Sequence, residues 1–235
     1  MKARRLRLPV PDEVVDAVSA AVHEPAADAG GAGANLLLAP GAGGDLDGAP
    51  LVALAGSVAA HGHRVVRVNL PYREAGKGGA PRAERSVAGY RAILEAARRE
   101  LDPEGTWIAG GKSYGGRVAT MAVADGMEVD GLVLYGYPMH APGKPERLRV
   151  EHWPRVDAPC LFLQGTRDTF GSVALLEEHR RHLPRRATVE VVEGGDHSLA
   201  VTGKASPDGR PHRAEEVVAG LGGVVADWIS RLPER

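Results

Sequence analysis

The chain has 235 residues and a formal net charge of −1, with 29 lysines and arginines against 30 acidic residues. This balance excludes the basic surface expected of a nucleic-acid-binding protein, and no apolar run is long enough to predict a membrane span. The single cysteine, Cys160, excludes an internal disulfide and is compatible with a reducing cytoplasm. The basic start at residues 1–5 is followed by Pro9 and Pro11, so no signal peptide is predicted. We expect one α/β domain over residues 1–235.

Short apolar runs recur along the chain, with helical patterns between them. Near-continuous apolar runs are typical of strands that are covered on both faces. Before them, residues 5–8 and 15–18 alternate weakly and are predicted to pair as an antiparallel edge. The Gly/Ala-rich stretch 26–34 is predicted to be a flexible connection. The predicted core strands are residues 35–38, 65–68, 106–109, 132–135, 160–163 and 189–192.

Apolar residues three or four positions apart predict four helices. Their stripes are Leu51, Leu54 and Val58; Val87, Tyr90, Leu94, Ala97 and Leu101; Val118, Met121 and Ala122; and Val217, Leu221, Val224 and Trp228. Strands that alternate with helices through right-handed crossovers form a doubly wound, mostly parallel sheet with flanking helices. In such sheets, functional residues gather at the carboxyl ends of the strands.

A Gly-Lys-Ser-Tyr-Gly motif at residues 111–115 directly follows the third core strand. A strand that turns sharply into a helix, with serine at the apex, exposes the hydroxyl as a nucleophile. The competing interpretation is a phosphate-binding loop, which would need glycine at the position of Thr106. The glycines at 41–44 do not complete a dinucleotide fingerprint, because Leu46 occupies the third glycine position. Ser113 is therefore the predicted nucleophile, and we expect no cofactor.

An acid and a base follow other predicted strands. Asp168 comes shortly after the strand at 160–163, and His197 lies in a Gly-rich loop after the last strand. We expect His197 to take the proton of Ser113, and Asp168 to hold the imidazole in the required tautomer. Asp196 is the rival acid, but adjacent residues in a tight loop seldom point the same way. The position of Asp168 directly after a strand favours it.

The order Ser113, Asp168, His197 and the surrounding motifs resemble the α/β-hydrolase superfamily. The resemblance is closest to the small dienelactone-hydrolase-like group of the testis-expressed-protein-thirty and NSL-complex-subunit-three type. The matching segments are residues 39–44, 69–72, 110–117, 136–145, 163–168 and 195–198. Where the family's first loop commonly opens with His-Gly, this chain has Pro40 and Gly41. The resemblance implies an α/β-hydrolase fold and an esterase-like activity, although some relatives serve as complex subunits.

Acyl transfer also needs N–H donors for the oxygen that becomes negative in the tetrahedral intermediate. We expect Tyr114 and Ala42 to supply them from the backbone, with Gly43 as an alternative to Ala42. The residues predicted to contact substrate are Gly41, Gly43, Lys112, Met139 and His140. Lys112 would either steer an anionic substrate or pair with a surface acid. The segment 138–159 is too short for a large cap, so a minimal lid or none is predicted, and residues 203–211 are expected to form a mobile loop beside His197.

The sequence thus predicts a cytoplasmic serine hydrolase that cleaves an ester or related acyl bond of a small molecule. No metal-ligand spacing is present, and neither a nucleic acid nor a membrane is an expected partner. Thioesterase, peptidase and acyltransferase activities stay open because they share the same apparatus. The alternative is a non-catalytic scaffold of the same fold that binds a protein partner. The oligomeric state is not predicted.

Overall fold

A central sheet dominates the computed structural model, which describes residues 3–26 and 33–233. In this part of the chain the strand order is β1-β2-β4-β3-β5-β6-β9-β10. The strands are β1 Arg4–Pro9, β2 Ala17–His23, β3 Asn35–Ala39, β4 Arg64–Val68, β5 Trp107–Lys112, β6 Gly131–Tyr135, β9 Cys160–Gly165 and β10 Ala187–Val192. All six predicted core strands are confirmed. The predicted connection at 26–34 falls mostly outside the described residues.

The sheet is parallel from β4 to β10, and its antiparallel pairs in the described residues are β1 with β2 and β2 with β4. The antiparallel edge expected from the sequence is confirmed, but its second strand begins at Ala17 rather than at residue 15. The cause is a turn before it, in which the Val10 N–H donates to the carbonyl of Asp16 at 3.0 Å. β2 then pairs with β4, which joins this edge to the parallel sheet.

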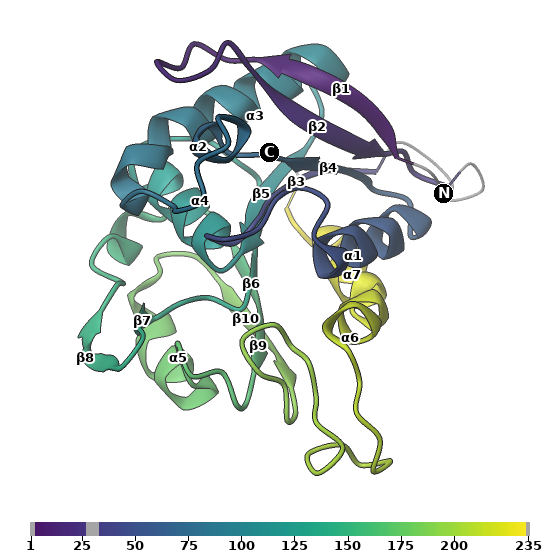
Figure 1. Cartoon of the computed structure of the whole chain (residues 1–235), viewed down its shortest axis with the longest axis vertical. Helices are drawn as coiled ribbons and strands as arrows, with labels where there is room; N and C mark the ends of the chain where they lie inside the picture. Colours follow the sequence, from purple (N-terminus) through teal and green to yellow (C-terminus); the bar gives the residue numbers. More distant parts are fainter. Residues whose placement is uncertain (1–2, 27–32, 234–235) are drawn as a thin grey trace.

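Helices cover both faces of the sheet (Figure 1). One face carries α1 Ala49–Ala60, α6 Ala214–Gly220 and α7 Gly222–Ile229, and the other carries α3 Val87–Leu101, α4 Tyr114–Ala124 and α5 Val173–His179. Two apolar clusters fill the spaces between helices and sheet, one containing Leu54 of α1 and the other Tyr90 of α3. Each helix is held by burial of its apolar stripe, which is the main driving force for such packing.

The C-terminal helical pattern differs from its prediction in two ways. The expected single helix is divided at Leu221 into α6 and α7. The large apolar residues that it buries are Val218, Val225 and Ile229, whereas Val217 and Trp228 are only partly buried. The buried positions 218, 225 and 229 each lie one residue after the predicted positions 217, 224 and 228, so the predicted stripe lies at the margin of the buried face rather than at its centre.

No lid covers the sheet within the described residues. After β6 the chain forms a small hairpin, β7 His140–Ala141 and β8 Lys144–Leu148, within the segment that was judged too short for a large cap. A short helix, α2 Pro71–Glu74, follows β4. The carboxyl ends of β3, β5, β9 and β10 therefore stay accessible at one edge of the sheet, where the serine motif lies.

Candidate active site

The serine motif forms a sharp turn between β5 and α4. Ser113 has φ 49° and ψ −110°, a backbone conformation that costs free energy in a non-glycine residue. Its N–H donates to the carbonyl of Tyr135 on β6 at 2.8 Å, and its carbonyl accepts from the Arg117 N–H at 3.0 Å. These bonds hold the strained residue in place. The turn therefore presents the Ser113 side chain above the carboxyl end of the sheet.

Two glycines of the motif allow the turn to lie against the end of β3. Gly111 has φ 155°, and a Cβ there would lie 2.3 Å from the carbonyl oxygen of Ala39. A Cβ on Gly115 would lie 2.6 Å from the carbonyl oxygens of both Ala39 and Pro40. Since no real Cβ tolerates such distances, only glycine permits this approach. The serine turn and the loop that follows β3 are consequently packed backbone to backbone.

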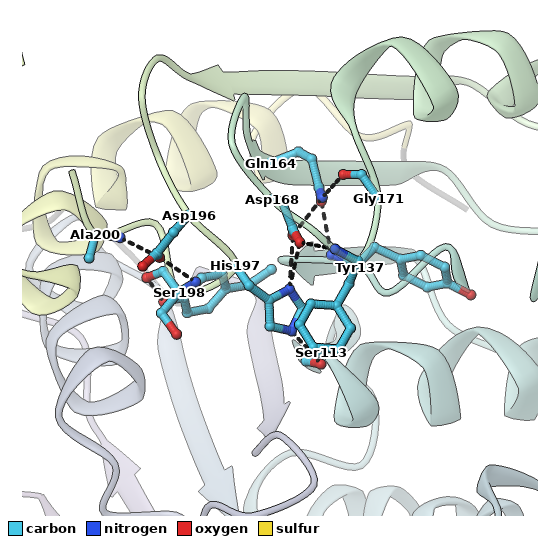
Figure 2. Close-up of polar contacts among 11 residues, drawn as sticks. Ser113, Tyr137, Gln164, Asp168, Gly171, Asp196, His197, Ser198 and Ala200 are labelled. Atoms are coloured by element: carbon cyan, nitrogen blue, oxygen red, sulfur yellow. Dashed lines mark hydrogen bonds and ion pairs between the residues drawn. The ribbon is translucent and has the colours of Figure 1, made fainter. Parts of the chain in front are cut away.

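The structure brings together the three residues that the sequence analysis chose as nucleophile, base and acid (Figure 2). His197 Nε2 lies 2.8 Å from the hydroxyl oxygen of Ser113. His197 Nδ1 lies 2.9 Å from Oδ2 and 3.0 Å from Oδ1 of Asp168. With its proton on Nδ1, the imidazole donates to the carboxylate and accepts the serine hydroxyl. This arrangement can remove the hydroxyl proton as Ser113 attacks an electrophile.

Asp168 and His197 differ in burial. The Asp168 side chain is 0% exposed, whereas that of His197 is 19% exposed. Asp168 Oδ1 accepts the Phe170 N–H at 2.8 Å, and Oδ2 accepts the amide of Gln164 at 2.8 Å. A buried carboxylate needs such donors to offset lost hydration. They also fix the direction of the Asp168 side chain toward the imidazole.

Asp196, the rival acid, is turned into its own loop. Its Oδ1 accepts the N–H groups of Ser198 at 2.7 Å and Ala200 at 3.0 Å (Figure 2). This carboxylate therefore shapes the loop that carries His197, while Asp168 faces the ring.

Two residues that were not predicted from the sequence hold Asp168 and His197 in place. Gln164 links the acid to its surroundings, because its amide also donates to the Gly171 carbonyl while its oxygen accepts the Tyr137 N–H. The Phe170 ring lies against the His197 ring, with centroids 4.2 Å apart. A glutamine that ends the apolar run 160–163 was the available signal for Gln164. Nothing in the sequence marked Phe170.

The expected oxyanion donors lie on either side of Ser113. Tyr114 is the first residue of α4, where a backbone N–H has no acceptor within the helix. Across from it, residues 41–44 form a turn in which the Gly44 N–H donates to the Gly41 carbonyl at 3.0 Å. The Tyr72 hydroxyl donates to the carbonyl of Ala42 at 2.9 Å. Burial raises the pKa of Tyr72 to about 12, so this hydroxyl keeps its proton.

A cleft of about 470 Å³ opens beside Ser113 and His197. The lining consists of residues 40–45, Gly48, Pro50, Leu51, Lys112, Ser113, Phe170, His197 and Ser198. This volume lies within the range of small-molecule sites. The glycine loop, the first turn of α1 and the two rings of Phe170 and His197 form its walls. The Ser113 hydroxyl is therefore accessible to a small electrophile.

Comparison with known proteins identifies the fold. A family model described as an alpha/beta hydrolase domain matches residues 32–222. The chain belongs to this α/β-hydrolase family.

Three solved structures illustrate the likeness. A lidless α/β serine hydrolase from Xanthomonas campestris has a TM-score of 0.68 and 19% identity, with 100% of this chain and 97% of the other covered. A dienelactone hydrolase from Anabaena variabilis has a TM-score of 0.71 and 15% identity, with both chains covered to 100%. An esterase domain of a Rhodothermus marinus protein has a TM-score of 0.65 and 13% identity, with 99% of each chain covered. At these identities the likeness concerns the fold.

The remaining predicted site residues of this α/β hydrolase divide into two groups. Gly41, Gly43 and Lys112 line the cleft. Met139 and His140 lie outside its lining: Met139 is fully buried and packs toward Gly171, and His140 Nδ1 lies 2.9 Å from the carbonyl oxygen of Ala141. The hairpin β7–β8 carries them away from the cleft, a fold detail that the position after β6 did not reveal. Residues 203–211 are also absent from the lining.

The described residues contain neither a candidate metal site nor a candidate membrane span. Residues 3–26 and 33–233 contain no group of three or more His, Cys, Asp or Glu side chains that could hold a metal ion. Over the same ranges, no helix combines the length and the apolar character needed to cross a membrane.

Proposed function

We propose that this α/β hydrolase is a serine hydrolase that cleaves a carboxylic ester through an acyl-enzyme on Ser113. The observation that carries the proposal is the chain of contacts from the buried Asp168 through His197 to the Ser113 hydroxyl, at 2.9 and 2.8 Å. A neutral serine is a weak nucleophile, and an imidazole at this distance is the base that activates it. The structural likeness to proteins described as a serine hydrolase, a dienelactone hydrolase and an esterase domain supports the same chemistry.

The reaction then proceeds in two halves. As the Ser113 oxygen bonds to the ester carbonyl carbon, its proton passes to His197 Nε2, and the carbonyl oxygen becomes negative. The N–H groups of Tyr114 and Ala42, or Gly43 in place of Ala42, stabilise this oxyanion. The bond to the alcohol breaks, and the alcohol takes the proton from Nε2. A water molecule then attacks the acyl carbon, gives its proton to Nε2, and the acid leaves as Ser113 regains that proton. Asp168 stabilises the imidazolium during both halves.

Labelling with a fluorophosphonate probe tests the proposal. The wild-type protein should form a covalent adduct detectable by mass spectrometry, because the probe reacts with activated serines. Ser113→Ala should abolish the adduct. Ser230→Ala, which removes a hydroxyl outside the cleft, should label like the wild type. If several probes fail to label the wild type, the proposal is wrong and a non-catalytic scaffold that binds a protein partner becomes the better interpretation.

Tyr72→Phe should lower kcat for p-nitrophenyl acetate by about tenfold, with a smaller effect on KM. The variant loses the hydroxyl that donates to the Ala42 carbonyl, so the glycine loop no longer holds the Ala42 N–H in its direction toward the oxyanion. A misdirected N–H weakens stabilisation of the transition state more than binding of the substrate. Tyr114→Phe is the matched control: the two rings meet edge to face at 5.9 Å, but the Tyr114 hydroxyl bonds Ser86 instead. Equal effects of the two variants on kcat would show that Tyr72 does not position Ala42.

Further assignments belong to the same proposal. The motif segments support membership of the small dienelactone-hydrolase-like group of the testis-expressed-protein-thirty and NSL-complex-subunit-three type. We assign a single domain to residues 1–235, a small-molecule acyl substrate and a cytoplasmic location.

The only cysteine is fully buried, and burial raises the pKa of the Cys160 thiol, so it packs in the core without reacting.

A further inference from the structure

Lys112 is a charged side chain of the cleft that the proposed mechanism does not use. It ends β5 directly before Ser113 and lines the same cleft. Its Cδ lies 4.0 Å from the position of a Cβ on Gly41, so the aliphatic part runs beside the glycine loop. The ammonium lies 5.5 Å from the ring centroid of Tyr135. Within the described part of the chain it has neither a hydrogen bond nor an ion pair.

Two acids lie close enough for their charges to act on the Lys112 ammonium, and both are hydrogen-bonded to other groups. Asp168 binds His197, Phe170 and Gln164, and Asp196 accepts two N–H groups of its own loop. Both attract the ammonium from a distance, yet burial outweighs them and lowers the pKa of Lys112. A cation that is partly removed from water in this way is stabilised when an anion binds to it.

The rest of the cleft wall does not compete for this cation. Asp45 is the one carboxylate among the described residues that line the cleft. It faces Arg73, with 3.7 Å between Oδ2 and the guanidinium, and its Oδ1 accepts the Asp47 N–H at 2.9 Å. The first turn of α1, which forms part of the same wall, contains no acidic residue. A negatively charged group in the cleft would therefore meet Lys112 without an unpaired carboxylate beside it.

We propose that Lys112 binds a carboxylate of the substrate, so that the preferred substrate of this hydrolase is an ester that carries a carboxylate close to its scissile bond. The inference rests on the proposed function, because the subsite and the serine share one cleft. The carboxylate belongs either to the acyl part or to the alcohol part of the ester. The chemistry that Lys112 recognises is the same in both.

Matched pairs of esters test this inference. For the acyl part, the mono-p-nitrophenyl ester of glutaric acid is compared with its neutral amide analogue, the p-nitrophenyl ester of glutaric acid monoamide. For the alcohol part, 4-carboxyphenyl acetate is compared with 4-carbamoylphenyl acetate. Spontaneous hydrolysis is subtracted. In at least one pair, the wild-type kcat/KM should be about tenfold or more higher for the charged ester, the size of a charge-assisted hydrogen bond.

Variants assign the preference to Lys112. Lys112→Met should lower the charged-to-neutral ratio of kcat/KM to about one, whereas Lys112→Arg should keep most of it. Lys77→Met removes an exposed lysine that does not line the cleft and should leave the ratio unchanged. Wild-type hydrolysis of all four esters without preference for a charged member, or an unchanged ratio in Lys112→Met, overturns the carboxylate subsite while the esterase proposal stands. Hydrolysis of none of them, together with no probe labelling, overturns both.

Discussion

Asp168→Asn should lower kcat for ester hydrolysis by about 10⁴, the cost of presenting the wrong imidazole tautomer. Both carboxylate oxygens of Asp168 accept hydrogen bonds, Oδ1 from the Phe170 N–H and Oδ2 from the Gln164 amide. In the variant an NH₂ group replaces one of these oxygens. This NH₂ group then faces an N–H donor, unless the side chain rearranges. If it faces His197, the ring proton moves to Nε2, which can then no longer accept the proton of Ser113.

Asp196→Asn is the matched comparison for the acid. Its Oδ1 accepts the Ser198 and Ala200 N–H groups, and an asparagine oxygen can accept both. We expect kcat to fall by less than about threefold, since neutral acceptors replace charged ones at modest cost. Steady-state kinetics on one neutral ester, with circular dichroism to verify folding, measures both variants. A larger loss in Asp196→Asn than in Asp168→Asn would reverse the assignment of the acid.

Gly115→Ala should reduce the free energy of unfolding by about 3 kcal/mol and lower kcat by more than tenfold. The added Cβ would lie 2.6 Å from the carbonyl oxygens of Ala39 and Pro40, and both are backbone atoms that cannot rotate away. The glycine loop must therefore shift away from Ser113, which separates the two expected oxyanion donors. Urea unfolding and ester kinetics on the same preparation measure the two effects.

Gly220→Ala is the control for this variant. A Cβ at that position at the end of α6 meets no atom within 4 Å. We expect its stability to change by less than about 0.5 kcal/mol and its kcat to match the wild type. If Gly115→Ala behaves like Gly220→Ala, the tight packing of the serine turn against β3 does not constrain the site.

The sequence predicted the parallel part of the sheet because its strands are short apolar runs, and those inside the sheet are buried on both faces. The run at 132–135 is an example, since every residue of β6 is buried. The edge was harder to predict. β2 has an exposed turn before it rather than a clear apolar start, so its first residue was misplaced. The break at Leu221 depends on how α6 and α7 pack against α1, which no local pattern records.

The contact of Ser113, Asp168 and His197 was predictable because parallel strands end at one edge of the sheet and each residue follows such a strand. Gln164 was not predicted, although it lies near the carboxyl end of β9, because only its hydrogen bonds to Asp168 and Tyr137 reveal a role. Phe170, Met139 and His140 lie on loops and a hairpin whose paths depend on packing. For these residues the position after a strand did not determine which side chain faces the cleft.

The lack of a lid has a consequence for the fate of the acyl group. A segment that closes over an active site expels water and protects a reactive intermediate from hydrolysis, which favours transfer of an acyl group to another alcohol or an amine. In this fold no described segment performs that closure, so in the proposed acyl-enzyme water is the most abundant acceptor of the acyl group on Ser113. Partitioning experiments with added short alcohols should therefore yield mainly free acid.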